Sequence, residues 1–186
     1  MSAPVLDVRN LTKHFPIKSG IFKRSTAAVQ AVTDVSFSVG AGETLAIVGE
    51  SGCGKSTTGR ALLRLLEPDS GQVTLDGEEI TALPAARMQA ARRHMQMVFQ
   101  DPFGSLNPRM TVRETLMEPI LLHRVASGPA ADRMVSELLK TVGLNDYHAE
   151  RYPHEFSGGQ RQRICIARAL ATRPRLIVCD EPVSAL

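Results

Sequence analysis

A glycine-rich segment in which a lysine precedes hydroxyl residues, GESGCGKST from Gly49 to Thr57, has the residue types that bind phosphate. Glycines let backbone N–H groups converge on phosphate oxygens, and the start of a following helix adds partial positive charge. The segment fits the pattern GxxxxGK[ST], with a short apolar run before it and a helical pattern after it. We therefore expect Lys55 to reach the β- and γ-phosphates of a nucleotide and the Ser56 hydroxyl to ligate Mg²⁺.

The phosphate site is expected to include the whole of this loop. The alternative, a glycine-rich strand-to-helix turn without a ligand, is disfavoured because both flanking patterns fit. Cys53 inside the loop could be a modifiable thiol, but a tolerated small side chain is the simpler interpretation. The predicted binding residues are Gly49, Glu50, Ser51, Gly52, Cys53, Gly54, Lys55, Ser56 and Thr57.

A second anion site is predicted where FSGGQ precedes RQRICIARAL, at positions 156–170. Ser157 is a good helix N-cap residue, and glycines directly after it leave the amides at a helix start uncovered. Alone, Ser-Gly-Gly is more often a flexible linker, but here apolar residues follow at helical spacing. One helix start cannot easily share a phosphate with the first loop of the same chain, so we expect the two sites to meet across a dimer. The predicted binding residues are Ser157, Gly158, Gly159 and Gln160.

Two acidic residues, Asp180 and Glu181, follow the apolar run 176–179. Because ligands of open α/β sheets bind at the carboxyl ends of strands, we expect Asp180 to hold Mg²⁺ through water and Glu181 to act as general base. Such a pair is usually only a solvated strand end, and the phosphate loop is what favours the catalytic interpretation. Gln100, at the end of the predicted strand 95–99, is expected to sense the γ-phosphate or Mg²⁺.

Strand and helix patterns alternate along the chain and must position these groups. Leu45 to Val48 is a continuous apolar run, which predicts a strand buried on both faces, and so is 176–179. Basic residues and breakers predict a mobile basic loop over 16–30. The alternation predicts a parallel sheet with helices on both faces. The other predicted strands are 5–8, 35–39, 73–75 and 95–99, with a turn at 76–77. The predicted helices are 56–66, one from about 85, two within 111–143 that are separated at 127–129, and 157–171.

Composition sets limits on class and partners. At 186 residues, the chain is long enough for one domain with a real core. Its 22 Lys and Arg nearly balance 19 Asp and Glu, and with few aromatics no nucleic-acid surface is expected. The three cysteines have no CxxC spacing, which favours reduced thiols in a cytosolic protein. We expect no signal peptide and no membrane helix, so a role in transport would need other polypeptides to supply the pore.

Together these motifs resemble those of the ATP-binding subunits of ABC transporters, over the whole chain. GESGCGKST is similar to the Walker A motif, LIVCDEP to Walker B, VFQDP to the Q-loop, and FSGGQ to the signature motif, with Phe156 where Leu is commoner. Phe15, in NLTKHF, falls where the family places an aromatic that stacks on adenine. The stretch FQDPFGSLNPRMTV resembles the dipeptide and oligopeptide importer branch, which also includes nickel importers.

The resemblance implies an α/β P-loop NTPase fold: a RecA-like parallel sheet core with an antiparallel β subdomain and an inserted helical subdomain. It implies a single partial domain, with residues 1–100 and 166–186 as nucleotide-binding core and 101–165 as the helical subdomain. The implied ligands are ATP and Mg²⁺. The implied partners are a second ATP-binding subunit, identical or not, two transmembrane permease subunits and, indirectly, a substrate-binding protein. The implied location is peripheral, on the cytoplasmic face of the inner membrane.

The resemblance stops after VSAL, where the family continues with an Asp, further strands and a His that contacts the γ-phosphate. In this fold the strand after Walker B lies between the Walker A and Walker B strands. We therefore expect that the C-terminal part of the core is missing, that two buried strands lack a neighbour, and that these 186 residues are part of a longer subunit.

Two other classes compete with the importer hypothesis. DNA-repair and chromosome-organising ATPases share the same motifs, but they carry a long coiled coil between Walker A and the signature, and no heptad run lies there in this chain. A non-catalytic nucleotide-binding fragment is the second alternative, because the family's later His is absent. In such importers the transported substrate is chosen by other polypeptides.

Overall fold

The computed structural model describes residues 3–18 and 25–181. The chain forms two compact units, Met1–Gln89 and Ala90–Leu186, which are taken one at a time below. Lys23 and Arg24, expected in a basic loop, lie outside the described residues.

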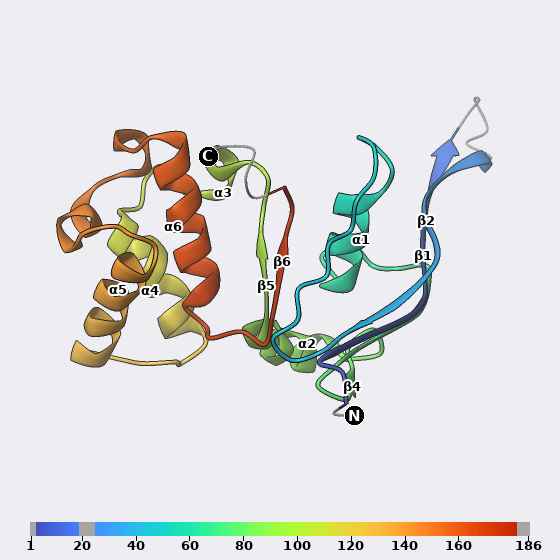
Figure 1. The fold of residues 1–186 in the computed structure, drawn as a ribbon, viewed down its shortest axis with the longest axis horizontal. Coiled ribbons are helices and arrows are strands. Elements are labelled where there is room, and N and C mark those ends of the chain that lie inside the picture. Colours follow the sequence, from blue (N-terminus) through green and yellow to red (C-terminus); the bar gives the residue numbers. More distant parts are fainter. Residues whose placement is uncertain (1–2, 19–24, 182–186) are drawn as a thin grey trace. The chain divides into compact units, whose positions relative to one another are not determined.

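The first unit is built on an antiparallel sheet of strand order β2-β1-β3-β4 (Figure 1). Its strands are β1 (Leu6–Lys18), β2 (Ser25–Val39), β3 (Ser70–Leu75) and β4 (Glu78–Glu79). The predicted loop over 16–30 is therefore wrong at both ends, because β1 and β2 pair as far as Ile17 with Ala27 and Lys18 with Ser25. Pro16 is tolerated there because β3 pairs with β1 only as far as Thr12, so no ladder on that side is interrupted.

The turn between β3 and β4 forms as predicted at Asp76 and Gly77. Both residues have positive φ, 48° and 82°, which a two-residue hairpin turn with the right-handed twist of its strands requires. Alternate β1 side chains, Leu6 and Val8, are buried with Val73 of β3 in the core of this unit.

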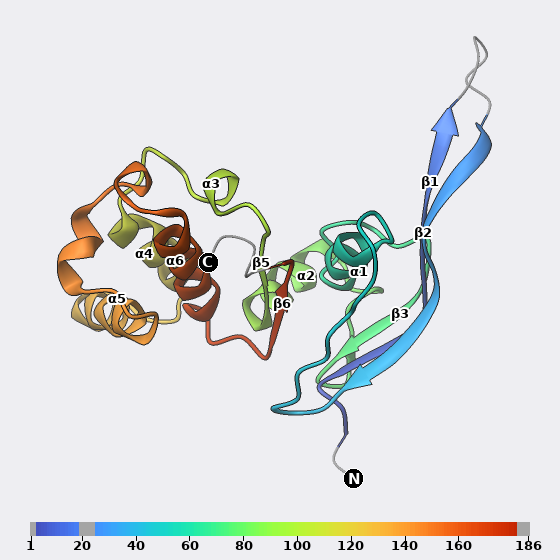
Figure 2. The ribbon, with the colours of Figure 1, turned by 45° about the horizontal axis from the view of Figure 1, so that its top comes forward.

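Helix α1 (Lys55–Leu62) packs against β1 and β2, as both ribbon views show (Figures 1 and 2). Ala61 and Leu62 supply its buried side chains. The helix ends earlier than the predicted residue 66, since Arg64 takes a left-handed conformation with φ 47°.

The predicted strand Leu45–Val48 does not form. Leu45 and Ile47 are each 44% exposed and Val48 is 86% exposed, and among the described residues this segment has no strand partner. A lone extended segment leaves its backbone groups to water, so apolar side chains alone do not make it a strand. The prediction was wrong because it assumed that a neighbouring strand would pair with this segment on each side.

The second unit contains a parallel pair, β5 (Met95–Val98) and β6 (Leu176–Cys179), in register from Met95 with Leu176 to Val98 with Cys179. Met95, Met97 and Val98 are buried, whereas β6 is only half-buried and Cys179 is exposed. The predicted burial of 176–179 on both faces is therefore wrong, because β5 is the one strand that pairs with β6 among the described residues.

Helices form the rest of the second unit, and α6 packs against β5 (Figure 1). The separation of two helices at 127–129 was predicted correctly. Their shared core contains Val112, Leu116, Ile120, Val135, Leu139 and Ile164. The helices are α3 (Pro102–Ser105), α4 (Val112–Leu122), α5 (Pro129–Thr141) and α6 (Gly158–Leu170), with short 3-10 turns η1 (Arg92–His94), η2 (Asp146–Glu150) and η3 (Pro153–Glu155); α2 (Ala85–Ala91) spans the junction between the units.

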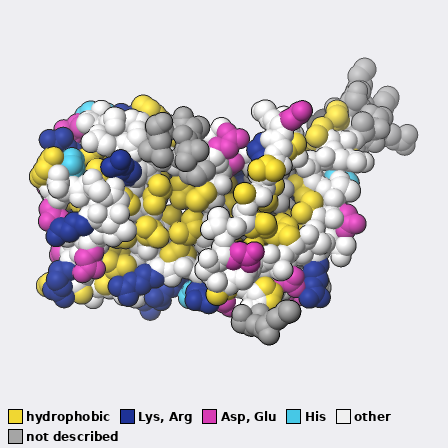
Figure 3. All heavy atoms as spheres, viewed as in Figure 1, with side chains coloured by type: hydrophobic (Ala, Val, Ile, Leu, Met, Phe, Trp, Pro, Cys, Tyr) yellow, Lys and Arg dark blue, Asp and Glu magenta, His cyan; other side chains and the backbone are white. Residues whose placement is uncertain are grey.

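Charges of both signs lie interspersed on the face drawn in Figure 3, as a nearly balanced composition predicts. Over the described part of the chain, no helix has both the length and the apolar character needed to cross a membrane.

Candidate functional site

The glycine-rich loop before α1 closes on its own lysine. Lys55 Nζ donates hydrogen bonds of 2.8 Å to the carbonyl oxygens of Gly49 and Glu50. The Cys53 backbone N–H donates to Glu50 O at 3.3 Å, which turns the loop back toward the helix. The lysine ammonium is therefore held at the loop, by carbonyls that an incoming phosphate would have to replace.

Two glycines give this loop a backbone that other residues rarely adopt. Gly52 and Gly54 have φ values of 82° and 98°. A Cβ on Gly54 would lie 2.0 Å from the carbonyl oxygen of Ala31 on β2, and a Cβ on Gly49 would lie 2.6 Å from Cys53 Sγ. The loop thus needs glycine for conformation at two positions and for close approach at Gly49 and Gly54.

The start of α1 suits an anion. Gly54 is its N-cap residue, and within the described residues no side chain caps this end and no acidic residue occupies the first turn. The partial positive charge of the helix start is therefore not neutralised by a carboxylate of the first turn.

We expect Gly54→Ala to disrupt the loop, because the new Cβ meets the Ala31 carbonyl and the positive φ is strained. Nucleotide affinity and the melting temperature should both fall, measured by equilibrium binding and by calorimetry. Gly42→Ala is a matched control: Gly42 also has a positive φ, 73°, but a Cβ there meets nothing within 4 Å. Equal losses in the two variants would mean that close approach to β2 is unimportant.

Ser157 caps α6, as predicted. Its Oγ accepts from the Gln160 backbone N–H at 3.3 Å, and Gln160 Oε1 accepts from the Ser157 N–H at 3.0 Å. This reciprocal capping box fixes the entry of the chain into the helix. The sequence interpretation missed that Gln160 belongs to the cap, although Ser-x-x-Gln is the pattern that signals it.

Arg161, directly after this cap, was missed as a structural anchor. It is only 7% exposed, its Nε donates to Pro153 O at 2.6 Å, and its guanidinium lies 3.6 Å from the ring centroid of Phe103 on α3. The hydrogen bond ties the start of α6 to η3, and the contact with the ring ties it to α3. In the sequence, Arg161 is one of several arginines in RQRICIARAL, and nothing there marks it as an anchor.

The parallel strands bring Gln100, Asp180 and Glu181 together at their carboxyl ends. Gln100 Nε2 donates a 2.7 Å hydrogen bond to Glu181 Oε2, and the Asp180 backbone N–H donates to Val98 O at 2.9 Å. Asp180 is only 7% exposed, and Glu181 has a φ of 47°. The two strand ends singled out from the sequence thus meet, with a direct side-chain contact between the predicted sensor and the predicted base.

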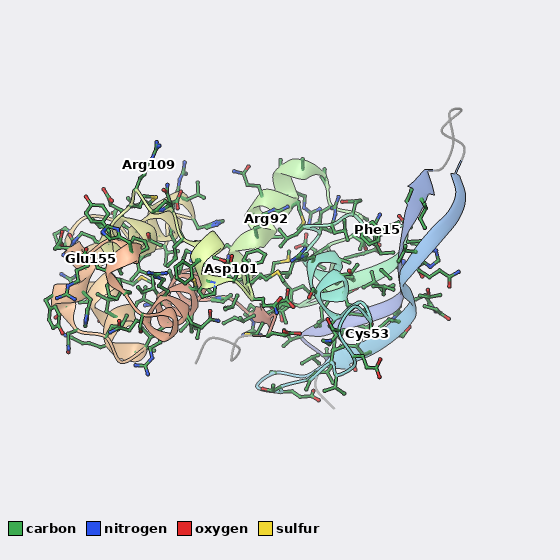
Figure 4. All side chains as sticks on the ribbon, turned by 90° about the horizontal axis from the view of Figure 1, so that it is seen from above. Phe15, Cys53, Arg92, Asp101, Arg109 and Glu155 are labelled. Carbon is green, nitrogen blue, oxygen red and sulfur yellow. The ribbon has the colours of Figure 1, made fainter. Side chains whose placement is uncertain are left out.

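Phe15 lies on β1, opposite Val29 of β2, and its side chain is 38% exposed (Figure 4). A partly exposed aromatic ring on a strand offers a flat apolar surface for stacking. Cys53, also labelled in Figure 4, lies exposed in the loop before α1.

All three cysteines are free thiols, as expected for a reduced protein. Burial raises the pKa of Cys165 above the usual thiol value, and partial desolvation does the same for Cys179, although that residue is exposed at the surface. Neither of these two thiols is therefore activated as a nucleophile.

Comparisons with known proteins agree with these observations. A family model described as ABC transporter matches residues 32–184. The glutathione import ATP-binding protein GsiA of Pectobacterium atrosepticum is 56% identical over 183 residues, and that of Escherichia coli K12 is 55% identical. Each match covers 98% of this chain but 29% of the relative, so the chain spans less than a third of the length of these relatives.

Solved structures agree in fold. The dimeric ATP-binding cassette MJ0796, bound to ADP and Pi in a post-hydrolysis state, superposes with a TM-score of 0.84 at 32% identity, covering 97% of this chain and 75% of that one. The α/β fold is thus that of a P-loop ATP-binding cassette. The family model matches most of the length of this chain, and the sequence motifs agree with it. The chain therefore belongs to the ABC transporter family.

Proposed function

We propose that this chain binds and hydrolyses ATP to power import by an ABC transporter. Two observations carry the proposal: in the first unit, the phosphate loop whose carbonyls hold Lys55, and in the second unit, the Gln100–Glu181 hydrogen bond at the strand ends. The loop has the groups that bind phosphates, and the hydrogen bond places the candidate base Glu181 next to the candidate sensor Gln100.

In the phosphate loop, Lys55 would exchange the carbonyls of Gly49 and Glu50 for the β- and γ-phosphates. The glycines and the uncapped start of α1 would supply backbone N–H groups and partial positive charge. Phe15 would stack on the adenine. The loop residues from Glu50 to Thr57 then enclose the phosphate chain.

For Mg²⁺ we assign Ser56 in the phosphate loop of the first unit, and Gln100 and Asp180 at the strand ends of the second unit. Hydroxyl, amide and carboxylate oxygens are the hard ligands that Mg²⁺ prefers, and nucleotide sites use few carboxylates because the phosphates supply the rest. Since Gln100 Nε2 donates to Glu181, its Oε1 is the atom left for a cation. When bound, the cation would neutralise charge on the phosphates. Among the described residues, no group of three or more His, Cys, Asp or Glu could hold a metal ion by itself.

Hydrolysis would require Glu181 to accept a proton from water. Its carboxylate accepts a 2.7 Å hydrogen bond from Gln100 Nε2, which orients the candidate base at the carboxyl end of β6.

Ser157, Gly158, Gly159 and Gln160 would bind the ATP held by a second subunit. The capping box presents a rigid helix start, and the solved cassettes similar to this chain are described as dimeric. We propose the same head-to-tail arrangement here, with an identical or a related subunit.

Peptide import is the proposed process, because the similar curated proteins are named for import of glutathione, itself a tripeptide. Two permease subunits and, indirectly, a substrate-binding protein would be the partners, at the cytoplasmic face of the inner membrane. We assign residues 1–100 and 166–186 to the nucleotide-binding core and 101–165 to the helical subdomain that docks on the permease.

Mixing two inactive variants of the full-length protein tests the proposal. Lys55→Ala and Ser157→Arg should each lose ATPase activity, since one damages the phosphate loop and the other the signature. If Ser157 acts on the partner's ATP, a mixed dimer combines both defects in one site and leaves the other site intact. Mixing should therefore restore part of the activity, measured as phosphate release. No recovery, with mixed dimers present by size-exclusion chromatography, would contradict the shared site.

A further inference from the structure

Asp69, between α1 and β3, is bonded to the three residues of β1 that precede Phe15. Its Oδ1 accepts from Lys13 Nζ at 2.7 Å and its Oδ2 accepts from the His14 backbone N–H at 2.6 Å. The Asp69 N–H donates to Thr12 O at 2.9 Å. Asp69 is therefore hydrogen-bonded to three consecutive residues of β1. All of these groups belong to the first unit.

Residues 12–14 of β1 lie where the hydrogen bonding of β1 to β3 ends, so the Asp69 bonds stabilise a part of the strand that the sheet holds on one side. Pairing of β1 with β3 ends at Thr12 opposite Ser70, and the pairing with β2 shifts register between Lys13 and His14. Beyond this point β1 has β2 as its one strand partner among the described residues. The Asp69 carboxylate takes the place of the lost ladder by accepting the His14 N–H.

Lys13 links this tie to the aromatic ring. Its side chain is 15% exposed, and its ammonium lies 5.8 Å from the centroid of the Phe15 ring, within the range of a cation–π contact. The hydrogen bonds from Lys13 and from the His14 N–H lower the pKa of Asp69, so its carboxylate keeps its charge to a lower pH than usual. The Lys13 ammonium near the Phe15 ring is thus held by the negative charge of the Asp69 carboxylate.

We propose that Asp69 is a positioning residue for nucleotide recognition: by holding Lys13 and the backbone of His14, it sets the Phe15 ring for stacking on the base. The inference rests on the proposed function, in which Phe15 stacks on adenine. Val29, exposed and opposite Phe15, extends the same apolar surface. Asp69 does not touch the nucleotide, so its effect should appear only where the base contributes to binding.

Binding of two ligands, Mg-ATP and inorganic tripolyphosphate, distinguishes the contribution of the base from that of the phosphates. In the full-length protein, Asp69→Asn should raise the Kd of Mg-ATP about three- to tenfold, the range of one aromatic stacking contact, and raise KM without lowering kcat. The Kd of inorganic tripolyphosphate should not change, because it has no base. Asp7→Asn is the matched control: it removes the same charge on the same strand, from an exposed pair with Arg9.

A double-mutant cycle tests whether Asp69 acts through the ring. Phe15→Ala should weaken Mg-ATP roughly tenfold, and Asp69→Asn added to it should have no further effect. Lys13→Met, which keeps the bond from His14 to Asp69, should show a smaller rise in the Kd of ATP. This variant keeps the test informative if Asp69→Asn fails to fold.

The outcomes are distinguishable. Wild-type protein that binds neither ligand would contradict the proposed function itself. Wild-type binding of ATP, with Asp69→Asn weakening ATP and tripolyphosphate equally or adding fully to Phe15→Ala, would overturn the positioning role alone.

Discussion

Lys55→Ala in the full-length protein should lower ATP turnover by roughly 10²-fold or more and weaken nucleotide binding sharply. Lys55 Nζ already sits at the loop, 2.8 Å from two carbonyl oxygens, so it meets the phosphates without a large rearrangement. Alanine removes the ammonium that would neutralise charge on the transferred phosphate. It also removes the ties that close the loop, so binding and turnover should fall together.

The measurements are phosphate release and equilibrium binding of Mg-ATP. Lys140→Ala is the control, because Lys140 is an exposed lysine on α5 whose ion pair with Asp146 spans 3.6 Å. Surface pairs of this kind contribute little, so that variant should match the wild type. Unchanged turnover in Lys55→Ala would remove the basis for assigning the loop to phosphate.

Local signals in the sequence predicted the local structure well. The Ser157 cap, the turn at Asp76 and Gly77, and the break between α4 and α5 each depend on residues only a few positions apart. A cap or a tight turn is decided by its own backbone preferences and short hydrogen bonds. Such features need no knowledge of the rest of the fold.

Structure that depends on distant partners was predicted less well. The run Leu45–Val48 has the composition of a buried strand, yet it remains exposed and unpaired among the described residues. Conversely, breakers such as Pro16 and Gly20 suggested a loop, but cross-strand pairing carries β1 to Lys18. Strand formation is a property of pairs, so a single run of residues cannot settle it.

The candidate site shows the same division. The phosphate loop and the acidic pair were found from short motifs, whereas the hydrogen bond between Gln100 and Glu181 joins residues 81 positions apart. The contact of Arg161 with Phe103 and the tie from Asp69 to β1 also depend on folding. Sequence reasoning located the groups that carry chemistry, and the structure added the residues that hold them.

Glu181→Gln should nearly stop hydrolysis while leaving Mg-ATP binding intact. An amide has almost the same shape as a carboxylate, and its oxygen can still accept the hydrogen bond from Gln100 Nε2. It cannot accept a proton from water at neutral pH, and loss of a general base costs about 10²–10⁴-fold in rate. Binding and folding should therefore survive a change that removes turnover.

Because ATP stays intact in this variant, the nucleotide-bound dimer should accumulate, seen as a size shift when Mg-ATP is added. Glu137→Gln, an exposed position on α5, makes the same chemical change away from the strand ends and should leave turnover and size unaltered. Wild-type turnover in Glu181→Gln would move the base to another residue. Loss of turnover without accumulation of a dimer would keep Glu181 as the base but separate hydrolysis from the shared site at Ser157. The variant thus tests the chemistry at the end of β6 and the assembly that the signature helix implies in one experiment.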